Sequence, residues 1–481
     1  MHNDKFTVKA VNDAVEWAMT HAMMLKDSPF SASHAAFVTT PTQISAQRYQ
    51  TLIDTAPLLG KMVDAVSEDA LFIQQAIKPL VSGDTFFSAL LTMHQKIHFS
   101  ESPVRRVPML IMRSDFMDDA VLGPKLIEFN AIAAGMGPFG QRAHELHHYL
   151  QNQWPTTFTP WQGEGAATLI ENKAIEQLGE GIAKATFQIK QEFNDSTPAT
   201  FLMVVQANED NVFDQHLLEL ELQRRGIRTI RRTFSELYGN LSTGDNHRLL
   251  LEGIGSIDTV YLRAGYQFSD YCSDNIVEEV CCEALMNTRM FMEQHRIAMN
   301  ATVGQQLASS KRVQMLLSSM PVSELSSFGL TITEAEQVKS VLGEMLPVTD
   351  QSVSWFATQS EQDWVLKNQG EGGGHCIFGQ DIAPKLSVLR TEDFHAWSLM
   401  RRLQPQPRTT SALAVRKGQT EIIDDLISEI GIFTVHLAGK PITQNKGYAG
   451  YLIRSKSTRT TEGGIHSGQG VLDSLVLSEI V

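Results

Sequence analysis

Along the first hundred residues, hydrophobic positions recur with the spacing of an α-helix. The segment 61–77, KMVDAVSEDALFIQQAI, is the clearest case, because its apolar residues fall on one face of a helix. Two apolar runs follow, 106–112 (RVPMLIM) and 125–135 (KLIEFNAIAAG), and they are typical of strands on either side of a turn. The pattern therefore predicts a mostly helical start that leads into a pair of strands.

A second pattern fills residues 200–303. FLMVVQ (201–206) is typical of a buried strand, NVFDQHLLELELQRR (211–225) of an amphipathic helix closed by Gly226, and IRTIRRTF (227–234) of the next strand. Strand, helix and strand joined by short turns form a βαβ unit with parallel strands. The alternation of helices and strands predicts a mixed α/β fold class.

The pattern divides the chain into three parts. We expect an N-terminal part at 1–199, a βαβ domain at 200–303 and a C-terminal part at 304–481. The last part contains two glycine-rich stretches, NQGEGGGHC at 368–376 and EGGIHSGQG at 462–470. A folded chain uses so many glycines together where its backbone bends sharply or approaches a ligand closely.

Composition and charge narrow the function classes. With 481 residues, 42% of them hydrophobic and 20% charged, the chain can bury a large core in two or three domains. There is no apolar run of about 18 residues to predict a membrane span, and the N-terminus is typical of an amphipathic helix, not a signal peptide. Four cysteines without a CxxC pair predict reduced thiols and a cytoplasmic location. The net charge of −14 argues against nucleic acid as a main partner.

The first glycine-rich stretch follows an apolar run that ends in Lys367. It lacks the GKS or GKT of a Walker A loop, and residue 375 is not the glycine that GxGxxG requires. The consecutive N–H groups of Gly372, Gly373 and Gly374 can form an anion nest, Lys367 can supply a positive charge to phosphate, and Glu371 can hold a metal. A surface loop with an incidental charge pair would show the same pattern.

The strand-like segment IEFN carries a second candidate. Because successive side chains of a strand alternate between faces, Glu128 and Asn130 point in the same direction. A carboxylate and an amide oxygen side by side are ligands of the kind that Mg²⁺ takes. The solvated polar face of an edge strand is the alternative.

Basic residues recur at the ends of apolar strands. Arg113 ends one run, Arg263 another with Tyr266 close by, and Arg454 and Lys456 share a strand face before the second glycine-rich stretch. Ligands of open α/β sheets bind beyond the carboxyl ends of strands. Together these residues predict a site for a substrate with several negative charges.

HELHH at 144–148 matches the zincin motif H-E-x-x-H. His144 and His148 would bind zinc, with Glu145 as the general base. The sequence offers no clear third ligand downstream, and a histidine-rich helix face is the favoured explanation of the motif. A zinc hydrolase stays open as an alternative.

Eight segments, taken in order, resemble the eukaryotic-type glutathione synthetases of the ATP-grasp superfamily. They are MRSD, IEFN, NVFDQ…IRTIRRTF, VYLRAGY, SSKRVQ, EGGG, LISEIGIF and LIRSK…EGG, and they span nearly the whole chain. The resemblance implies an ATP-grasp fold with an inserted parallel-sheet substrate-binding domain at 200–303 and a mobile lid at about 335–410. It implies a homodimeric ligase that joins γ-glutamylcysteine to glycine with ATP and Mg²⁺.

The resemblance also implies roles for individual residues. Catalytic roles fall to Arg113, Arg454 and Lys367, and metal binding to Glu128, Asn130 and Glu371. ATP binding falls to Glu128, Lys311, Lys367, Gly372, Gly373, Gly374, Phe378, Met400, Arg401, Leu403, Glu429, Lys456 and Glu462, with 400–403 as the hinge that meets adenine. Substrate binding falls to Arg113, Ala133, Gly135, Glu209, Asn211, Gln215, Arg263, Tyr266, Arg454, Ile465 and His466.

Departures from the family pattern concern the acceptor most. Ala133 and Gly135 stand where small hydroxyl residues are usual, and Ile465 and His466 replace a small pair in the second glycine-rich stretch. If both side chains point into the pocket they leave room for glycine alone, whereas a loop displaced outward would admit β-alanine, as in legume relatives. A ligase with another acceptor amine, such as β-alanine, and a binding homologue without turnover therefore stay open.

Overall fold

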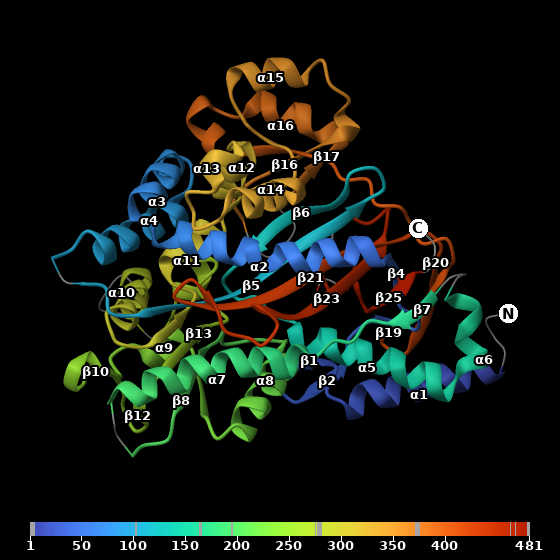
Figure 1. Ribbon diagram of the computed structural model, residues 1–481, viewed down its shortest axis with the longest axis horizontal. Coiled ribbons are helices and arrows are strands. Elements are labelled where there is room, and N and C mark those ends of the chain that lie inside the picture. The colour runs from blue at the N-terminus through green and yellow to red at the C-terminus, as the bar shows by residue number, and fades with distance from the viewer. Residues whose placement is uncertain are drawn as a thin grey trace.

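Helices cover both faces of a long twisted sheet in the computed structural model of the chain (Figure 1). The predicted mixed α/β fold class is confirmed. The structure describes residues 5–101, 103–162, 166–193, 196–274, 276, 281–370, 376–461, 463–466 and 468–478.

The largest sheet within these residues has thirteen strands. In spatial order they are β20 (Gln419–Ile423), β19 (Ala412–Arg416), β3 (Phe37–Val38), β24 (Val471–Asp473), β23 (Tyr448–Ser457), β21 (Leu426–Leu437), β5 (Val107–Asp119), β14 (Ala298–Asn300), β13 (Thr259–Leu262), β8 (Thr200–Val204) and β9 (Arg228–Arg232), with β6 (Gly123–Asn130) on β5 and β22 (Lys440–Pro441) on β21.

Alternate residues of β5 belong to two different apolar cores. Leu110 and Met112 lie in the core beneath α2 (Ala46–Glu68), whereas Met109 and Ile111 lie in the core on the opposite face. The second core includes side chains of α5 (Gly137–Gln153), α7 (Ala174–Phe193) and α8 (Val212–Arg224). A strand covered on both faces is apolar at nearly every position, which explains the continuous run seen in the sequence.

The predicted βαβ unit is present as β8, α8 and β9, which lie parallel beside β13. β14 pairs with both β13 and β5, so the parallel strands and the long antiparallel strands share one sheet. The end of the molecule that carries β8 and β13 also contains α9 (Phe234–Leu237), α10 (Cys281–Glu293) and a small sheet of β10 (Leu241–Thr243), β11 (Leu249–Leu251) and β12 (Gly255–Ile257) (Figure 1). The division of the chain into three domains stays a prediction.

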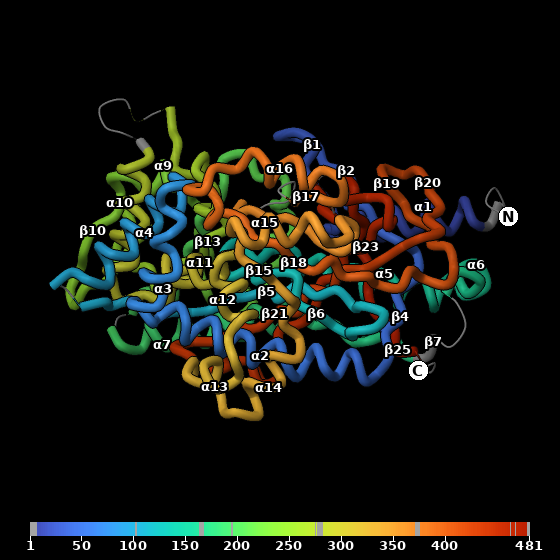
Figure 2. Tube along the Cα trace, turned by 90° about the horizontal axis from the view of Figure 1, so that it is seen from above, coloured from blue at the N-terminus to red at the C-terminus, as the bar shows by residue number. Residues whose placement is uncertain are grey.

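A separate four-stranded sheet lies above the long strands, and we call it the upper sheet (Figures 1 and 2). Trp364, Leu366, Leu399 and Phe356 contribute to an apolar core of its own. Its elements are β15 (Met345–Pro347), β16 (Trp364–Lys367), β17 (Cys376–Phe378) and β18 (Ser398–Arg401), with α15 (Asp350–Phe356) and α16 (Ile382–Val388) packed against it. α11 (Val303–Ala308), α12 (Lys311–Ser319), α13 (Val322–Leu325) and α14 (Ile332–Val341) precede it in the chain.

The N-terminal hundred residues differ from their helical prediction in two ways. First, α1 (Lys5–Thr20) is followed by four short strands, namely β1 (Met24–Ser28), β2 (Ser31–His34), β3 and β4 (Thr42–Ser45). β4 pairs with β25 (Leu475–Ser478), and β25 also pairs with β7 (Ala166–Leu169). The predicted helix at 61–77 is broken, because the side chain of Asp69 accepts the N–H of Phe72 and caps α3 (Ala70–Ile77), which precedes α4 (Thr85–His98).

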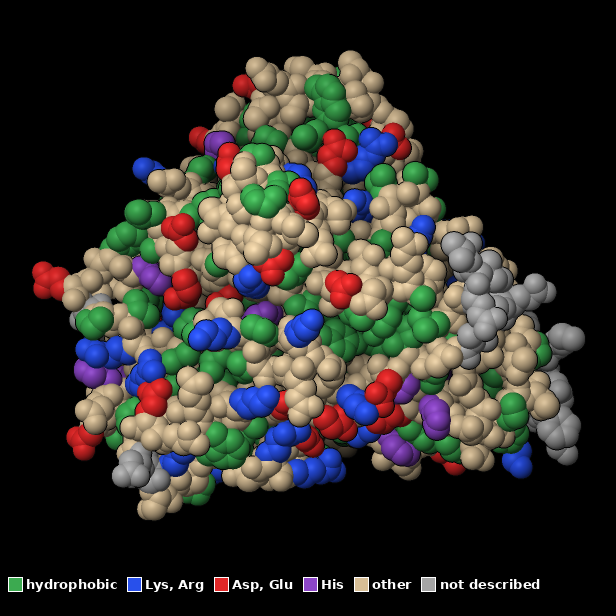
Figure 3. Space-filling view, in the orientation of Figure 1, with side chains coloured by type: hydrophobic (Ala, Val, Ile, Leu, Met, Phe, Trp, Pro, Cys, Tyr) green, Lys and Arg blue, Asp and Glu red, His purple; other side chains and the backbone are tan. Residues whose placement is uncertain are grey.

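None of the helices in the described ranges combines the length and the apolar character needed to cross a bilayer. On the face shown in Figure 3, Lys and Arg side chains are intermingled with Asp and Glu side chains.

Candidate active site

A cavity of about 620 Å³ lies between the long strands and the upper sheet. Its lining residues come from β5, β6, β16, β17, β18, β21 and β23 and from the loops at their ends. Most of the predicted site residues line it, namely Arg113, Glu128, Asn130, Ala133, Gly135, Glu209, Asn211, Arg263, Tyr266, Lys311, Lys367, Phe378, Met400, Arg401, Leu403, Glu429, Arg454, Lys456, Ile465 and His466.

The other predicted residues fall into two groups. Gln215 does not line the cavity, and on α8 its amide oxygen accepts a hydrogen bond from Arg231. Glu371, Gly372, Gly373, Gly374 and Glu462 lie outside the described residues.

Four neighbouring strands form the floor of the cavity. Directly opposite residues of antiparallel strands point to the same face, and here Arg113 is opposite Asn130 on β6, and Glu429 of β21 is opposite Arg454 of β23. β21 joins the two pairs, because it lies between β5 and β23. The strand register therefore gathers side chains that are more than 300 residues apart.

Asp115 connects side chains from three strands of this floor, although it was not among the residues predicted from the sequence. Its side chain is fully buried, and Arg113 donates to both of its carboxylate oxygens through Nε (2.6 Å) and Nη2 (2.8 Å). Oδ2 also accepts from Asn130 Nδ2 (2.9 Å) and Arg454 Nη2 (3.1 Å). One carboxylate thus holds two arginines close together, where both can face the same anion.

Gly431 of β21 leaves room for this group. A Cβ at this position would lie 2.7 Å from Arg113 Cδ and 2.8 Å from Asp115 Oδ1. A side chain there would therefore push the Arg113–Asp115 pair apart.

Two lysines meet Glu128 between the floor and the upper sheet. Lys311 begins α12, with Nζ 3.6 Å from Glu128 Oε2, and Lys367 ends β16, with Nζ 3.1 Å from the carbonyl oxygen of Ile127. Burial alone would raise the pKa of Glu128, but Lys311, Lys367 and the floor arginines lower it to about 2. Glu128 is therefore ionised at neutral pH.

Apolar side chains line the part of the cavity next to the upper sheet. Val365 is opposite both Met400 and Phe378 in the strand pairing, and all three line the cavity with Met117 and Ile427 of the floor. The Arg401 guanidinium lies 5.8 Å from the centre of the Trp364 ring, and its side chain is 45% exposed.

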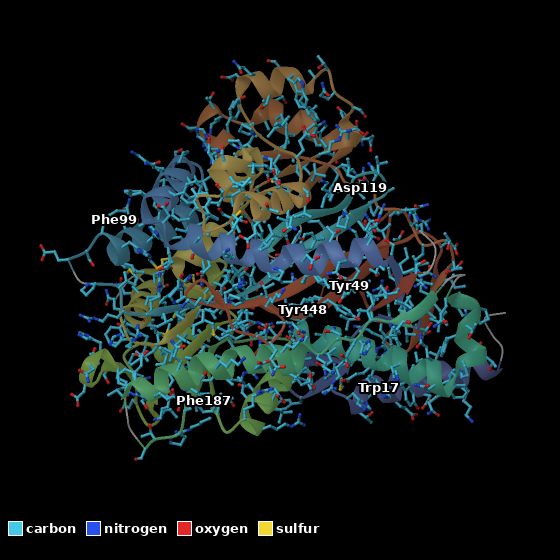
Figure 4. The ribbon with its side chains drawn as sticks, in the orientation of Figure 1. Trp17, Tyr49, Phe99, Asp119, Phe187 and Tyr448 are labelled. Atoms are coloured by element: carbon cyan, nitrogen blue, oxygen red, sulfur yellow. The ribbon has the colours of Figure 1, made fainter. Side chains whose placement is uncertain are left out.

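Asp119, labelled in Figure 4, ties the floor to the segment that follows β18. Its carboxylate accepts the N–H of Gln404 (2.7 Å) and those of Val121 and Leu122 (both 2.9 Å). Burial would raise its pKa, but these backbone hydrogen bonds lower it below the ordinary value, so the acceptor is charged. This aspartate therefore helps to hold 400–404 over the cavity, together with the hydrogen bond from the Ala120 N–H to the Gln404 carbonyl (3.1 Å).

Arg263 lies at the opposite end of the cavity, just beyond β13. Its Nη1 donates to Asp214 Oδ2 (3.2 Å), and Asp214 also accepts the N–H of Met136 (2.9 Å) before α5. Among the described residues, Arg263 Nε and Asn211 Oδ1 are buried without a hydrogen-bond partner. Buried polar groups are rarely left so, which points to a polar ligand.

The backbone at 133–135 explains one departure from the family pattern. A Cβ at Gly135 would lie 2.3 Å from Arg263 Nη2, and the Gly135 carbonyl oxygen accepts from Arg113 Nη1 (3.0 Å). Gly135 thus lets the Arg263 guanidinium lie directly over the chain, where a serine would displace it.

The second glycine-rich stretch reaches across the cavity mouth. Ile465 is 3% exposed and belongs to the core that includes side chains of α5, α7 and α8. It also lines the cavity. His466 Nδ1 lies 2.9 Å from Asp210 Oδ2, and the Asp210 carbonyl accepts the N–H of Lys26 from β1. His466 is thus engaged with Asp210 in the loop before α8.

The HELHH motif lies on α5, as a helix was expected there. Glu145 is paired with Arg142, and His148 is exposed next to Asn152. His147, between them, contacts Ser474 Oγ (2.6 Å) and the Val38 carbonyl (2.8 Å). Within the described ranges, no three His, Cys, Asp or Glu side chains are grouped as metal ligands.

A cavity that sets two arginines and two lysines around an ionised glutamate, below a small antiparallel sheet, is suited to an ATP-dependent carboxylate–amine ligase. The chain belongs to the family described as "Eukaryotic glutathione synthase, ATP binding domain", whose profile matches residues 4–477. The glutathione synthetase family and the ATP-dependent ligase class predicted from the sequence are confirmed by this match.

Two relatives illustrate the similarity. The chloroplastic glutathione synthetase of Solanum lycopersicum is 29% identical over 489 residues, covering 99% of this chain and 85% of that protein. The glutathione synthetase of Bos taurus is 29% identical over 479 residues, covering 96% of this chain and 95% of that protein.

One solved structure shares the fold. It is a glutathione synthetase-like effector of Globodera pallida in its apo form, with a TM-score of 0.70 and 19% identity. The match covers 98% of this chain and 96% of that one.

Proposed function

We propose that this chain joins γ-glutamylcysteine to glycine with the consumption of ATP. Membership of the eukaryotic glutathione synthases along nearly the whole chain carries this proposal. The cavity agrees with it, because its ends differ in chemistry: apolar side chains and lysines lie at one end, and the buried Arg263 lies at the other.

The reaction needs activation of a carboxylate, since a carboxylate is a poor electrophile toward an amine. An oxygen of the dipeptide carboxylate attacks the γ-phosphorus of ATP, and ADP leaves. The glycine nitrogen, as the free amine, then attacks the carbonyl carbon of the acyl phosphate, phosphate leaves, and the nitrogen loses a proton to become the amide. Positioning and charge neutralisation accomplish such a step without a protein nucleophile.

The floor arginines suit the reacting carboxylate. Arg113 and Arg454 converge on Asp115, so their remaining N–H groups face a common region of the cavity. Lys311 and Lys367, close to Glu128, are suited to the phosphates. These groups would stabilise the charge that develops on the transferred phosphoryl group.

Glu128 and Asn130 suit Mg²⁺, which would neutralise charge on the ATP phosphates. Glu128 is ionised, and Asn130 donates its amide N–H to Asp115, which leaves its amide oxygen for a ligand. Glu371 remains the third predicted ligand.

The apolar group of Val365, Met400, Phe378, Met117 and Ile427 suits a flat adenine ring. Hydrogen bonding there would fall to the backbone of 400–403, since the Arg401 side chain lies over Trp364. The second half of the cavity, with Arg263, Asn211, Glu209 and Tyr266, suits the γ-glutamyl end.

Two further properties stay proposals: a homodimer and a cytoplasmic location.

Measurement of ADP release with γ-glutamylcysteine and ATP tests the function, with glycine and β-alanine as separate acceptors. We expect release with glycine, dependent on Mg²⁺, and a product with the mass of glutathione. ADP release with β-alanine only would assign a different ligase, and ATP binding without release would assign a binding homologue.

A further inference from the structure

The sulfur atoms of two cysteines outside the cavity lie in van der Waals contact. Cys272 follows the turn η4 (Phe268–Tyr271), Cys282 lies in the first turn of α10, and their Sγ atoms are 3.5 Å apart. Cys272 is exposed and Cys282 is half-buried. Because the sulfurs of a disulfide are about 2.0 Å apart, the two sulfurs have to approach by about 1.5 Å to form one.

The turn that ends at Cys272 positions a residue of the cavity. Asp270 Oδ2 accepts the N–H groups of Gly265 (2.7 Å) and Tyr266 (3.1 Å), and Oδ1 accepts from Gln206 Nε2 (2.7 Å). Gln206 also donates to the Tyr266 hydroxyl (3.0 Å). Asp270, two residues before Cys272, therefore fixes Tyr266, which lines the cavity.

Helix α10 already holds this turn at one point. Arg289, fully buried, donates through Nη1 to the Tyr271 hydroxyl (2.8 Å) and to Gln306 Oε1 (2.5 Å). Cys282 lies two turns earlier on the same helix. A bond from Cys272 to Cys282 would give the turn a second attachment, next to the first.

We propose that Cys272 and Cys282 form a thiol–disulfide exchange site for small-molecule disulfides. In its oxidised form the disulfide ties the segment 265–272, which includes η4, to α10 and so holds Tyr266 in place. The exchange chemistry goes beyond the ligase activity, whereas its effect on dipeptide affinity rests on the proposed function.

The exchange needs only a disulfide as oxidant. The exposed Cys272 thiolate attacks one sulfur of glutathione disulfide, forming a mixed disulfide and releasing one glutathione thiolate. The Cys282 thiolate then attacks Cys272 Sγ, and the second glutathione leaves. Two electrons pass from the protein dithiol to glutathione disulfide, and the two thiol protons end on the two glutathione molecules.

The direction of the effect follows from pre-organisation. A turn already held in its binding geometry loses less entropy when the dipeptide binds, so affinity rises. If one or two fewer side chains must become ordered when the dipeptide binds, the KM for the dipeptide falls by about 2- to 10-fold. Because γ-glutamylcysteine and glutathione are thiols, they keep the pair reduced, and a shortage of them leaves it oxidised.

A thiol count tests the exchange site independently of ligase activity. The full chain is reduced, freed of reductant, incubated with glutathione disulfide, and alkylated under denaturing conditions. We expect two alkyl groups where the reduced chain, with four cysteines, takes up four. Cleavage after glutamate separates Cys272 from Cys282 and should yield the crosslinked peptides.

Matched variants identify the partners. Cys281→Ser, the neighbour of Cys282 in the sequence, should keep the crosslink. Cys282→Ser should lose it and retain glutathione on Cys272. A wild-type chain that keeps four reactive thiols, or a Cys281→Ser chain that loses the crosslink, would overturn the assignment.

A kinetic comparison tests the clamp. The assay uses a dipeptide with an ethyl group in place of the thiol side chain, γ-glutamyl-α-aminobutyrate, because a thiol substrate would reduce the pair. The oxidised wild type should show the lower KM for this dipeptide and an unchanged KM for ATP, and dithiothreitol should reverse the difference. An unchanged or raised KM, or the same change in Cys282→Ser, would refute the clamp, whereas a reduced chain without turnover would instead refute the proposed function.

Discussion

At the scale of single residues, Asp115 is the side chain that the sequence concealed. A carboxylate among arginines that bind an anion reduces their net charge, so the pattern of strand-end arginines gave no reason to include it. Its place two residues after Arg113 was a usable signal, because both side chains of such a pair share one face of a strand. Its contact with Arg454 depends on pairing through β21, which no local pattern reveals.

Asp115→Asn should lower kcat by roughly 10²-fold, the range seen when a group that supports developing charge is lost. An amide cannot accept from both nitrogens of Arg113 and also from Asn130 and Arg454, so the two arginines lose their common orientation. Steady-state rates of ADP release measure the effect. Asp118→Asn is the matched control, because that carboxylate binds Arg48 and does not line the cavity. Equal losses in both variants would indicate a general folding effect instead.

Gly135→Ala should weaken dipeptide binding without affecting ATP. The added Cβ would lie 2.3 Å from Arg263 Nη2 and force the guanidinium away. Loss of one charge-assisted hydrogen bond, about 1.5–3 kcal/mol, predicts a KM for the dipeptide raised by about 10- to 150-fold. The KM for ATP, measured with the same preparation, is the internal control. An equal rise in both would contradict the placement of Arg263.

The low pKa of Glu128, about 2, predicts how one side chain contributes to acid stability. Its pKa is depressed in the folded state, so its stabilisation is complete above the ordinary value of 4.5 and is lost as the pH falls toward 2. At pH 7, the free energy of unfolding of Glu128→Gln should therefore be lower than that of the wild type by on the order of 3 kcal/mol. Denaturant unfolding at several pH values should show this gap narrowing below about pH 4.5. A gap that stays constant to pH 3.5 would show that the lysines do not hold Glu128 ionised.

At the scale of elements, the sequence predicted what local periodicity encodes. The βαβ unit and the strands at 106–112 and 125–135 are present, although β6 ends at Asn130, before the positive φ of Ala133 and Met136. The strands β1 to β4 escaped prediction, because they are short and are stabilised by distant partners such as β25. Periodicity cannot report pairing between segments that far apart.

Asp119→Ala should loosen one attachment of the segment after β18 to the floor, while the backbone hydrogen bond from Ala120 to Gln404 remains. Its charged carboxylate accepts the N–H of Gln404 as well as that of Val121 in the turn after β5. We expect the KM for ATP to rise roughly 10-fold, corresponding to about 1.5 kcal/mol, with the KM for the dipeptide nearly unchanged. Val121→Ala, an 89% exposed neighbour, is the control and should behave like the wild type. A larger effect on the dipeptide than on ATP would contradict this role.

At the scale of the whole molecule, the fold turns scattered motifs into one cavity. The sequence alone could propose each arginine, lysine and acid by its place at a strand end, but only the resemblance to the family linked them. The structure adds what neither could supply, namely the central Asp115, the room made by Gly135 and Gly431, and the Asp210–His466 contact. These features depend on three-dimensional proximity and leave little trace in local spacing.

We expect the choice of acceptor to depend on segments from three distant parts of the chain. Ile465 is fixed in the core, and His466 is held by Asp210, whose backbone is in turn bound to β1. This arrangement favours the narrow pocket, because both side chains of the bulky pair are held in place and so oppose an outward displacement of the loop. One methylene is worth about 1–3 kcal/mol, so we expect a preference for glycine over β-alanine of roughly 10- to 200-fold in kcat/KM.

His466→Ala and Asp210→Ala should each reduce that preference, since either change frees the same end of the loop. The contact is partly exposed and worth at most about 1 kcal/mol, which limits the reduction to about 5-fold. Competition between the two amines measures the preference, and a wild-type enzyme that uses both equally well would refute the narrow pocket.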